Sequence, residues 1–163
     1  MSSKKITTRE NKSTPELKES IVKKYKGLQL RYEEVYYLDF AVDEDTGNID
    51  KSKKVKFYTK NQMDSNLKAL KNAYLIAKGA AAPSEIKRFR KKYKIPASIF
   101  SIVLGFSKNT ISNIEKDGNA SLSSGRLIKM CLNDKNIIYK YLQLCDSIDA
   151  LKKEELSERL LKE

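Results

Sequence analysis

The sequence predicts an α+β fold: a small β-rich region and one helix come first, and an all-helical domain of about five helices follows. Apolar residues recur with a strand-like period between residues 21 and 58, and with a helical period from residue 61 onwards. After Pro83 the chain contains only short segments of helical pattern. We therefore predict three parts, which are a flexible tail (1–16), a small α+β domain (17–79) and a helical domain (80–163).

Four strands are expected in the first half, because apolar and polar residues alternate there over short segments. The predicted strands are 21–25, 28–32, 35–42 and 55–58. Lys26 and Gly27 form a turn signal after the first of them, and Asp45–Asn48 forms a loop before the last. The first half thus predicts a small antiparallel sheet.

One helix is expected from residue 61 to residue 78, because its apolar residues are spaced by four and three positions. These residues are Met63, Leu67, Leu70, Tyr74 and Ala77. Asn61, followed by Asp64, is the expected N-cap. The segment from Gly79 to Pro83 ends the helix and separates the two halves of the chain.

The second half predicts short helices throughout. Pro83 and Pro96 each suit a first helical position. Further helices are expected over 122–132, 136–144 and 147–161. The last of these has Ile148, Leu151, Leu156 and Leu160 on one side, so it either caps the domain or pairs with a second copy of itself.

Charge and composition restrict the function. The formal net charge is +12, from 33 basic and 21 acidic residues, and so basic a small protein usually meets nucleic acid or an anionic membrane surface. The alternative is that the charge serves only solubility. No apolar run approaches the length of a membrane span, and residues 1–16 are polar, so we expect a cytoplasmic protein.

The sequence contains no residue pattern that is typical of an enzyme. The chain has no histidine, two widely separated cysteines and only scattered glycines. These features leave no usual zinc arrangement, no triad with a histidine base and no phosphate-binding loop. We expect no catalytic residues, no metal and no cofactor.

The segment from Pro96 to Gly118 carries the strongest functional signal, because it has the spacing of a helix-turn-helix. Ser101 is the small residue that faces the second helix, and Gly105 supplies the positive φ that the tight turn needs. Ile111 and Ile114 are the buried pair of the second helix. An ordinary α-hairpin is the alternative interpretation.

The polar residues of this segment predict contacts with double-stranded DNA. Side chains that hydrogen-bond base edges are expected at the start of the second helix, namely Ser107, Lys108, Asn109, Thr110 and Asn113. Ser107 is also the expected helix cap. Contacts with phosphates are expected from Lys87, Arg88, Lys91, Lys92, Lys94 and Lys116. Arg90 is expected to pair with Glu115 across the helices, as a structural contact.

The same segment resembles the XRE (phage-repressor-like) helix-turn-helix family over residues 84–132. The positions that carry the resemblance are Arg90, Ile95, Phe100, Ser101, Gly105, Phe106, Ser107, Thr110, Ile111, Ile114, Glu115 and Gly118. More narrowly, residues 61–145 are similar to antitoxins of the MqsA type. That similarity rests on Asn61, Leu67, Leu70, Tyr74, Pro83–Ile86, Arg90–Tyr93 and Ser121–Ile128. The resemblance implies a dimeric, autoregulating repressor that binds a palindromic operator.

The chain departs from these families in three places. Their N-terminal domain is commonly a zinc module that contacts a toxin, but this chain has no cysteine near its predicted strands. Ala97 stands where relatives often place a polar residue that contacts phosphate, and Asp117 adds a residue before Gly118. The resemblance therefore does not extend to zinc binding.

A protein partner is a further hypothesis. The region Glu33–Asp50 contains seven acidic residues and no basic one, which favours docking of a cationic protein such as an RNA-cleaving toxin. The alternative is an exposed acidic hairpin that DNA repels. The sequence as a whole predicts a sequence-specific DNA-binding regulator that forms a homodimer. The alternative function is a protein-interaction module, or a toxin-neutralising antitoxin, whose helix-turn-helix does not bind specific DNA.

Overall fold

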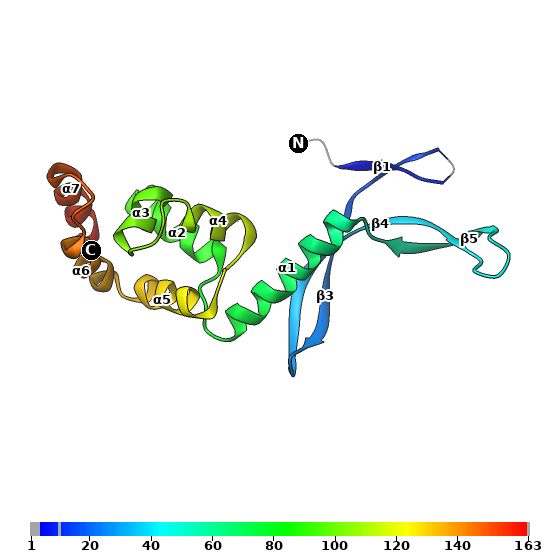
Figure 1. Cartoon of the computed structure of the whole chain (residues 1–163), viewed down its shortest axis with the longest axis horizontal. Helices are drawn as coiled ribbons and strands as arrows, with labels where there is room; N and C mark the ends of the chain where they lie inside the picture. Colours follow the sequence, from blue (N-terminus) through cyan, green and yellow to red (C-terminus); the bar gives the residue numbers. More distant parts are fainter. Residues whose placement is uncertain (1–3, 10, 163) are drawn as a thin grey trace. The chain divides into compact units, whose positions relative to one another are not determined.

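The computed structural model describes residues 4–9 and 11–162. The fold is α+β, with five strands in two sheets and seven helices in this part of the chain (Figure 1). The chain divides into two compact units, Met1–Lys71 and Asn72–Glu163, each of which we describe by itself. The division falls inside a helix, whereas the sequence predicted a boundary after residue 79.

The first sheet is a small hairpin of β1 (Lys5–Thr7) and β2 (Ser13–Pro15), which pair antiparallel. These strands lie where the sequence predicted a flexible tail, so that prediction was wrong. The loop between them is fixed by Arg9. Its backbone N–H donates to Asp39 Oδ2 at 3.3 Å, and its Nη1 donates to the Phe40 carbonyl at 3.0 Å.

The second sheet has the order β3–β4–β5 and is antiparallel throughout. Its strands are β3 (Leu17–Tyr25), β4 (Leu28–Val42) and β5 (Ile49–Phe57). The two strands predicted over 28–32 and 35–42 are one continuous strand, β4, which changes partner along its length. Its first part, from Leu28 to Tyr36, pairs with β3, and its last part, from Tyr37 to Val42, pairs with β5.

Helix α1 (Lys60–Ala77) begins with a reciprocal cap. The Gln62 N–H donates to Thr59 Oγ1 at 3.2 Å, and the Thr59 N–H donates to Gln62 Oε1 at 3.0 Å. This is a capping box, and it replaces the predicted N-cap at Asn61, which lies inside the helix. The apolar face is also less covered than predicted, since Met63 is 60% exposed.

Asn66 on α1 completes the edge of β4. Its Nδ2 donates to the Val35 carbonyl at 3.0 Å, and its Oδ1 accepts from the Val35 N–H at 2.9 Å. Val35 lies just before the part of β4 that pairs with β5. The side-chain amide therefore satisfies the backbone groups that a neighbouring strand would otherwise satisfy.

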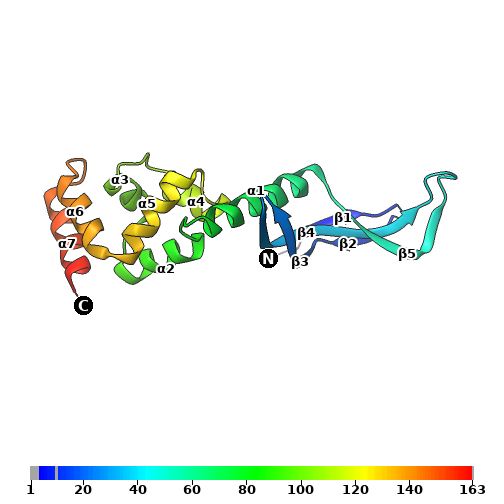
Figure 2. The same cartoon turned by 90° about the horizontal axis from the view of Figure 1, so that it is seen from below.

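Six helices follow in the described residues, where the sequence predicted about five (Figure 2). They are α2 (Pro83–Tyr93), α3 (Ala97–Val103), α4 (Thr110–Asp117), α5 (Leu122–Asn133), α6 (Lys135–Leu144) and α7 (Ala150–Leu161). All six contribute to one apolar core, in which Phe100 and Ile128 are fully buried. In the part of the chain that the structure describes, no helix has the length and apolar character to cross a membrane.

Helix α7 differs from the prediction in two respects. It begins at Ala150 rather than at 147, because Asp149 is its N-cap and accepts from the Lys152 N–H at 2.8 Å. Leu156 and Leu160 are buried, whereas Leu151 is 77% exposed, so the predicted apolar side is only partly covered by the rest of the unit.

Gly125 lets α5 pack directly against the segment that follows α1. The Ala81 N–H donates to the Gly125 carbonyl at 3.0 Å. A Cβ on Gly125 would lie 2.4 Å from the Cβ of Ala80 and 3.2 Å from its Cα. Because the second of these atoms is backbone, the added carbon could be accommodated only by moving the chain.

We predict that Gly125→Ala destabilises the protein, although alanine is usually the better helix residue by about 1 kcal/mol. Overpacking at Ala80 should outweigh that gain and cost about 1–3 kcal/mol. The melting temperature by circular dichroism should fall. A melting temperature equal to or above that of the wild type would contradict the close approach.

Candidate nucleic-acid interface

Helix α3 ends in a tight turn that leads to α4. Gly105 has φ of +84°, in the left-handed region that favours glycine. The Phe106 N–H donates to the Ser101 carbonyl at 2.9 Å, and the Gly105 N–H donates to the Ile102 carbonyl at 3.0 Å. These two bonds form a Schellman motif, which satisfies carbonyl groups at the end of α3. The turn has the glycine at the position that the sequence predicted.

A single buried hydroxyl connects α3 to α4. Ser101 is fully buried. Its Oγ donates to the Ala97 carbonyl one turn earlier, at 2.8 Å, and accepts from the Ile111 N–H of α4 at 2.9 Å. Ile111 and Ile114 are buried against the same core. The hydroxyl therefore gives a partner to a backbone donor of α4 that water cannot reach.

An ion pair connects α2 to α4. Arg90 donates from Nε to Glu115 Oε1 at 2.6 Å and from Nη2 to Glu115 Oε2 at 2.8 Å. Its Nη1 also donates to the Ile95 carbonyl at 3.1 Å. Arg90 and Glu115 are the pair that the sequence predicted, and the bidentate geometry fixes the rotation of α4 about its own axis.

The outer face of α4 is polar. Ile111 and Ile114 point into the core, and the residues on the opposite side are exposed. Spacings of three and four place these exposed residues on one face, and they are Asn109, Ser112, Asn113 and Lys116. Ser112 was not among the predicted contact residues, although its spacing from Asn109 is the signal that could have identified it.

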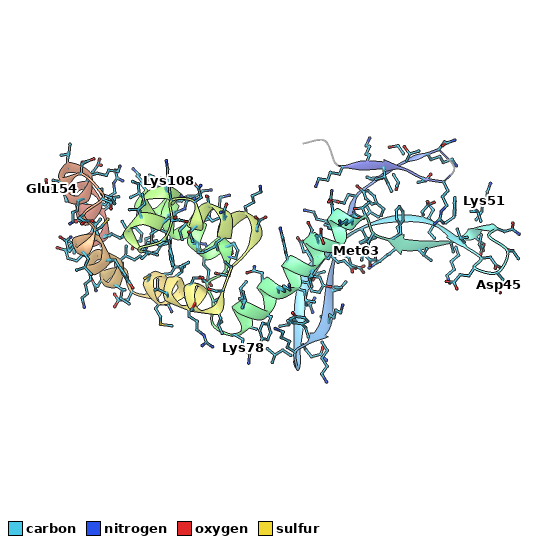
Figure 3. All side chains as sticks on the ribbon, in the orientation of Figure 1. Asp45, Lys51, Met63, Lys78, Lys108 and Glu154 are labelled. Atoms are coloured by element: carbon cyan, nitrogen blue, oxygen red, sulfur yellow. The ribbon has the colours of Figure 1, made fainter. Side chains whose placement is uncertain are left out.

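The predicted residues Ser107 to Asn109 precede α4 rather than form its first turn. The N-cap is Asn109, and no side chain caps the helix. The predicted cap, Ser107, instead has its hydroxyl 2.9 Å from that of Thr110, so the capping prediction was wrong. Lys108 is exposed beside this turn (Figure 3).

The basic residues of α2 divide into two groups. Lys87 and Lys91 are one turn apart and follow the side of α2 on which Arg90 meets α4. Arg88 and Lys92 lie further from Arg90 around α2, and they line a cavity of about 290 Å³ with Glu85 and the α5 residue Lys129. Arg88 is three residues from Lys91, so the two groups adjoin each other on the surface of α2.

The acidic region Glu33–Asp50 is largely occupied by internal contacts. Glu34 accepts from Lys56 Nζ at 3.2 Å, and Asp39 is buried. Asp43 and Asp50 accept backbone N–H groups of their own loop and strand. Lys56 also contacts Glu19, and this hydrogen bond is the main reason that the pKa of the Lys56 ammonium is raised.

No metal site is present among the described residues, which contain no cluster of three or more histidine, cysteine or acidic side chains suited to a metal. Both cysteines are free. Burial raises the pKa of the Cys131 thiol to about 11, which keeps it protonated at neutral pH.

Comparisons with family models, characterised proteins and solved structures found no significant match.

We predict that Ser101→Ala lowers the free energy of unfolding by about 1–3 kcal/mol, because the Ile111 N–H would lose its partner inside the core. Ser112→Ala is the matched control, since its hydroxyl bonds to the Asn109 carbonyl at an exposed position. The control should change stability by less than about 0.5 kcal/mol. Equal effects of the two substitutions in urea unfolding would contradict the role assigned to Ser101.

Proposed function

We propose that residues 83–118 form a helix-turn-helix and that the protein is a sequence-specific, double-stranded DNA-binding transcription regulator of the XRE type. The observation that carries this proposal is the Ser101 hydroxyl, which joins α3 to α4 across a turn with glycine in the left-handed conformation. The turn and this hydrogen bond hold two short helices in a fixed relation, and the polar face of α4 remains exposed.

In this proposal α4 enters the major groove. Asn109 and Asn113 have the side chains that pair with adenine through two hydrogen bonds, and Lys108 can donate to guanine acceptors. Ser107 and Thr110 adjoin them through their paired hydroxyls. Lys87, Lys91 and Lys116 supply contacts with phosphate that do not depend on sequence.

The proposal includes an autoregulating repressor, either antitoxin-like or phage-type. A neighbouring toxin gene would favour the antitoxin. Docking of a cationic toxin on Glu33–Asp50 has weaker support, because internal contacts already occupy several of these carboxylates. We therefore base the proposal on DNA and not on a protein partner.

A homodimer is the expected form of such a regulator, because a palindromic operator presents the same half-site twice. Leu144 and Leu151, on either side of the loop between α6 and α7, are 82% and 77% exposed. A two-fold contact through this loop would cover the same leucines on both copies. It would also explain why so apolar a pair remains at the surface of one copy.

We predict that Asn109→Ala and Asn113→Ala each cost about 1–3 kcal/mol in binding to the specific site and leave binding to random DNA unchanged. Fluorescence anisotropy with the protein's own promoter and a shuffled duplex of equal length, at several salt concentrations, measures both. Equal binding to the two duplexes by the wild type would remove the proposed specificity and favour a protein-interaction module.

Lys91→Ala should act differently, because a contact with phosphate carries no sequence information. It should weaken binding to the promoter and to the shuffled duplex alike, and it should reduce the slope of log affinity against log salt by about 1. Lys140, on α6 and exposed, is a matched control. If Lys140→Ala changed the slope as much as Lys91→Ala, the interface would be misplaced.

Leu151→Glu should convert the dimer to a monomer with little loss of stability, because Leu151 is exposed in the single chain. Light scattering coupled to size exclusion measures the mass of each form. Leu161→Glu is the control, since Leu161 is exposed at the other end of α7. A monomeric wild-type protein, or a dimeric Leu151→Glu variant, would exclude this interface.

A further inference from the structure

A second basic surface lies on the helical unit, away from α4. An open cavity of about 340 Å³ is lined by four cations and one aromatic residue, and these are Lys92, Tyr93, Lys94, Arg159 and Lys162. Among the described residues, no carboxylate lines it. It shares Lys92 with the neighbouring cavity of about 290 Å³, which Arg88 also lines. The two cavities therefore meet at Lys92, and among the described residues none from α4 lines either of them.

Some of the cations at this cavity cap the carbonyl ends of helices. The carbonyl ends of α2 and α7 both lie at the cavity, and cations commonly cap such ends. Arg159 Nη1 donates to the Lys94 carbonyl at 2.8 Å, and Lys135 Nζ donates to the Lys162 carbonyl at 2.7 Å. These two cations thus serve the helix ends, and Arg159 also pairs with Glu155 at 3.3 Å.

Three lysine ammonium groups that line the cavity do not cap a helix end. Among the described residues, Lys92, Lys94 and Lys162 form no ion pair with a carboxylate. Lys92 lies over the Tyr93 ring at 5.3 Å from its centre, and Lys135 lies 6.0 Å from the same ring. The two helix ends together contribute about one negative charge, so the three ammonium groups leave an excess of positive charge at the cavity.

We propose that this cavity binds a phosphate group, at a site separate from the α4 interface. Its volume is at the lower end of the range of roughly 300–1,000 Å³ for small-molecule sites, which suits a small phosphate rather than a whole nucleotide. The phosphate belongs either to a nucleic-acid backbone or to a free phosphorylated compound. The proposal does not depend on the DNA-binding function proposed above.

Pyrophosphate is the probe. In a titration of the full chain followed by ¹H–¹⁵N NMR, the Arg159 Nε–Hε signal and the Tyr93 amide signal should shift, with saturation. The variant Lys92→Gln/Lys94→Asn removes two of the three ammonium groups. Asparagine is chosen at residue 94 because φ there is +53°, which asparagine tolerates. The affinity for pyrophosphate should fall at least about tenfold.

The matched control is Lys68→Gln/Lys71→Gln, which removes two exposed lysines of α1 that line neither cavity. It should retain the pyrophosphate affinity of the wild type. The melting temperatures of both variants, measured by circular dichroism, show that each is folded. Absence of saturable shifts at Arg159 and Tyr93 in the wild type would overturn the proposal. An equal loss of affinity in the control would also overturn it, because the effect would then come from net charge alone.

A shuffled DNA duplex distinguishes the two sources of phosphate. If the source is a nucleic-acid backbone, the duplex displaces pyrophosphate from Arg159 and Tyr93, and Lys92→Gln/Lys94→Asn binds the duplex more weakly than the wild type. If the source is a free compound, the duplex leaves the pyrophosphate signals unchanged, and the variant binds the duplex as the wild type does. Both outcomes keep the phosphate site and assign its ligand.

Discussion

The arrangement of α3 and α4 depends on one buried hydroxyl. A backbone N–H in an apolar core costs about 1–3 kcal/mol if it has no partner, and the Ile111 N–H lies in such a core. Ser101 supplies the partner from another helix, and its own proton goes to the Ala97 carbonyl within α3. A longer polar side chain would not fit at a fully buried position, and alanine would leave the donor unsatisfied. The residue type is thus set by geometry.

Packing against the same core determines where the basic residues of α2 lie. Ile86, Phe89 and Tyr93 commit one face of α2 to the core, so the cations occupy what is left of its surface. They continue around the helix in one direction from Arg90, which Glu115 neutralises. A run of basic residues that is continuous in sequence therefore extends around α2, from the side where Arg90 meets α4 to the cavities lined by residues of α5 and α7.

The helical half was the more predictable, because its signals are local. Gly105, Ser101 and the isoleucines of α4 lie within a span of fourteen residues, and their spacing alone indicates a turn between two helices. The first half depends on pairings between distant residues. The sequence did not show that β4 is one long strand with two partners, or that Arg9 fixes the first hairpin to Asp39. The cavities that Arg88, Lys92 and Lys94 line also required the positions of α5 and α7.

The acidic region illustrates why composition along the chain misleads in a sheet. Residues 33–50 contain no base, but β4 pairs with β5, which brings Lys54 opposite Phe40 and Lys56 opposite Leu38. Glu19 and Glu34 face each other across β3 and β4, and Lys56 contacts both. The register thus places positive charge beside the negative charge that sequence separates from it. The acidic side chains that remain lie chiefly in the β4–β5 loop. There the Asp43 carboxylate accepts backbone N–H groups of its own turn. The acidic region is therefore better explained as part of the sheet than as a docking surface.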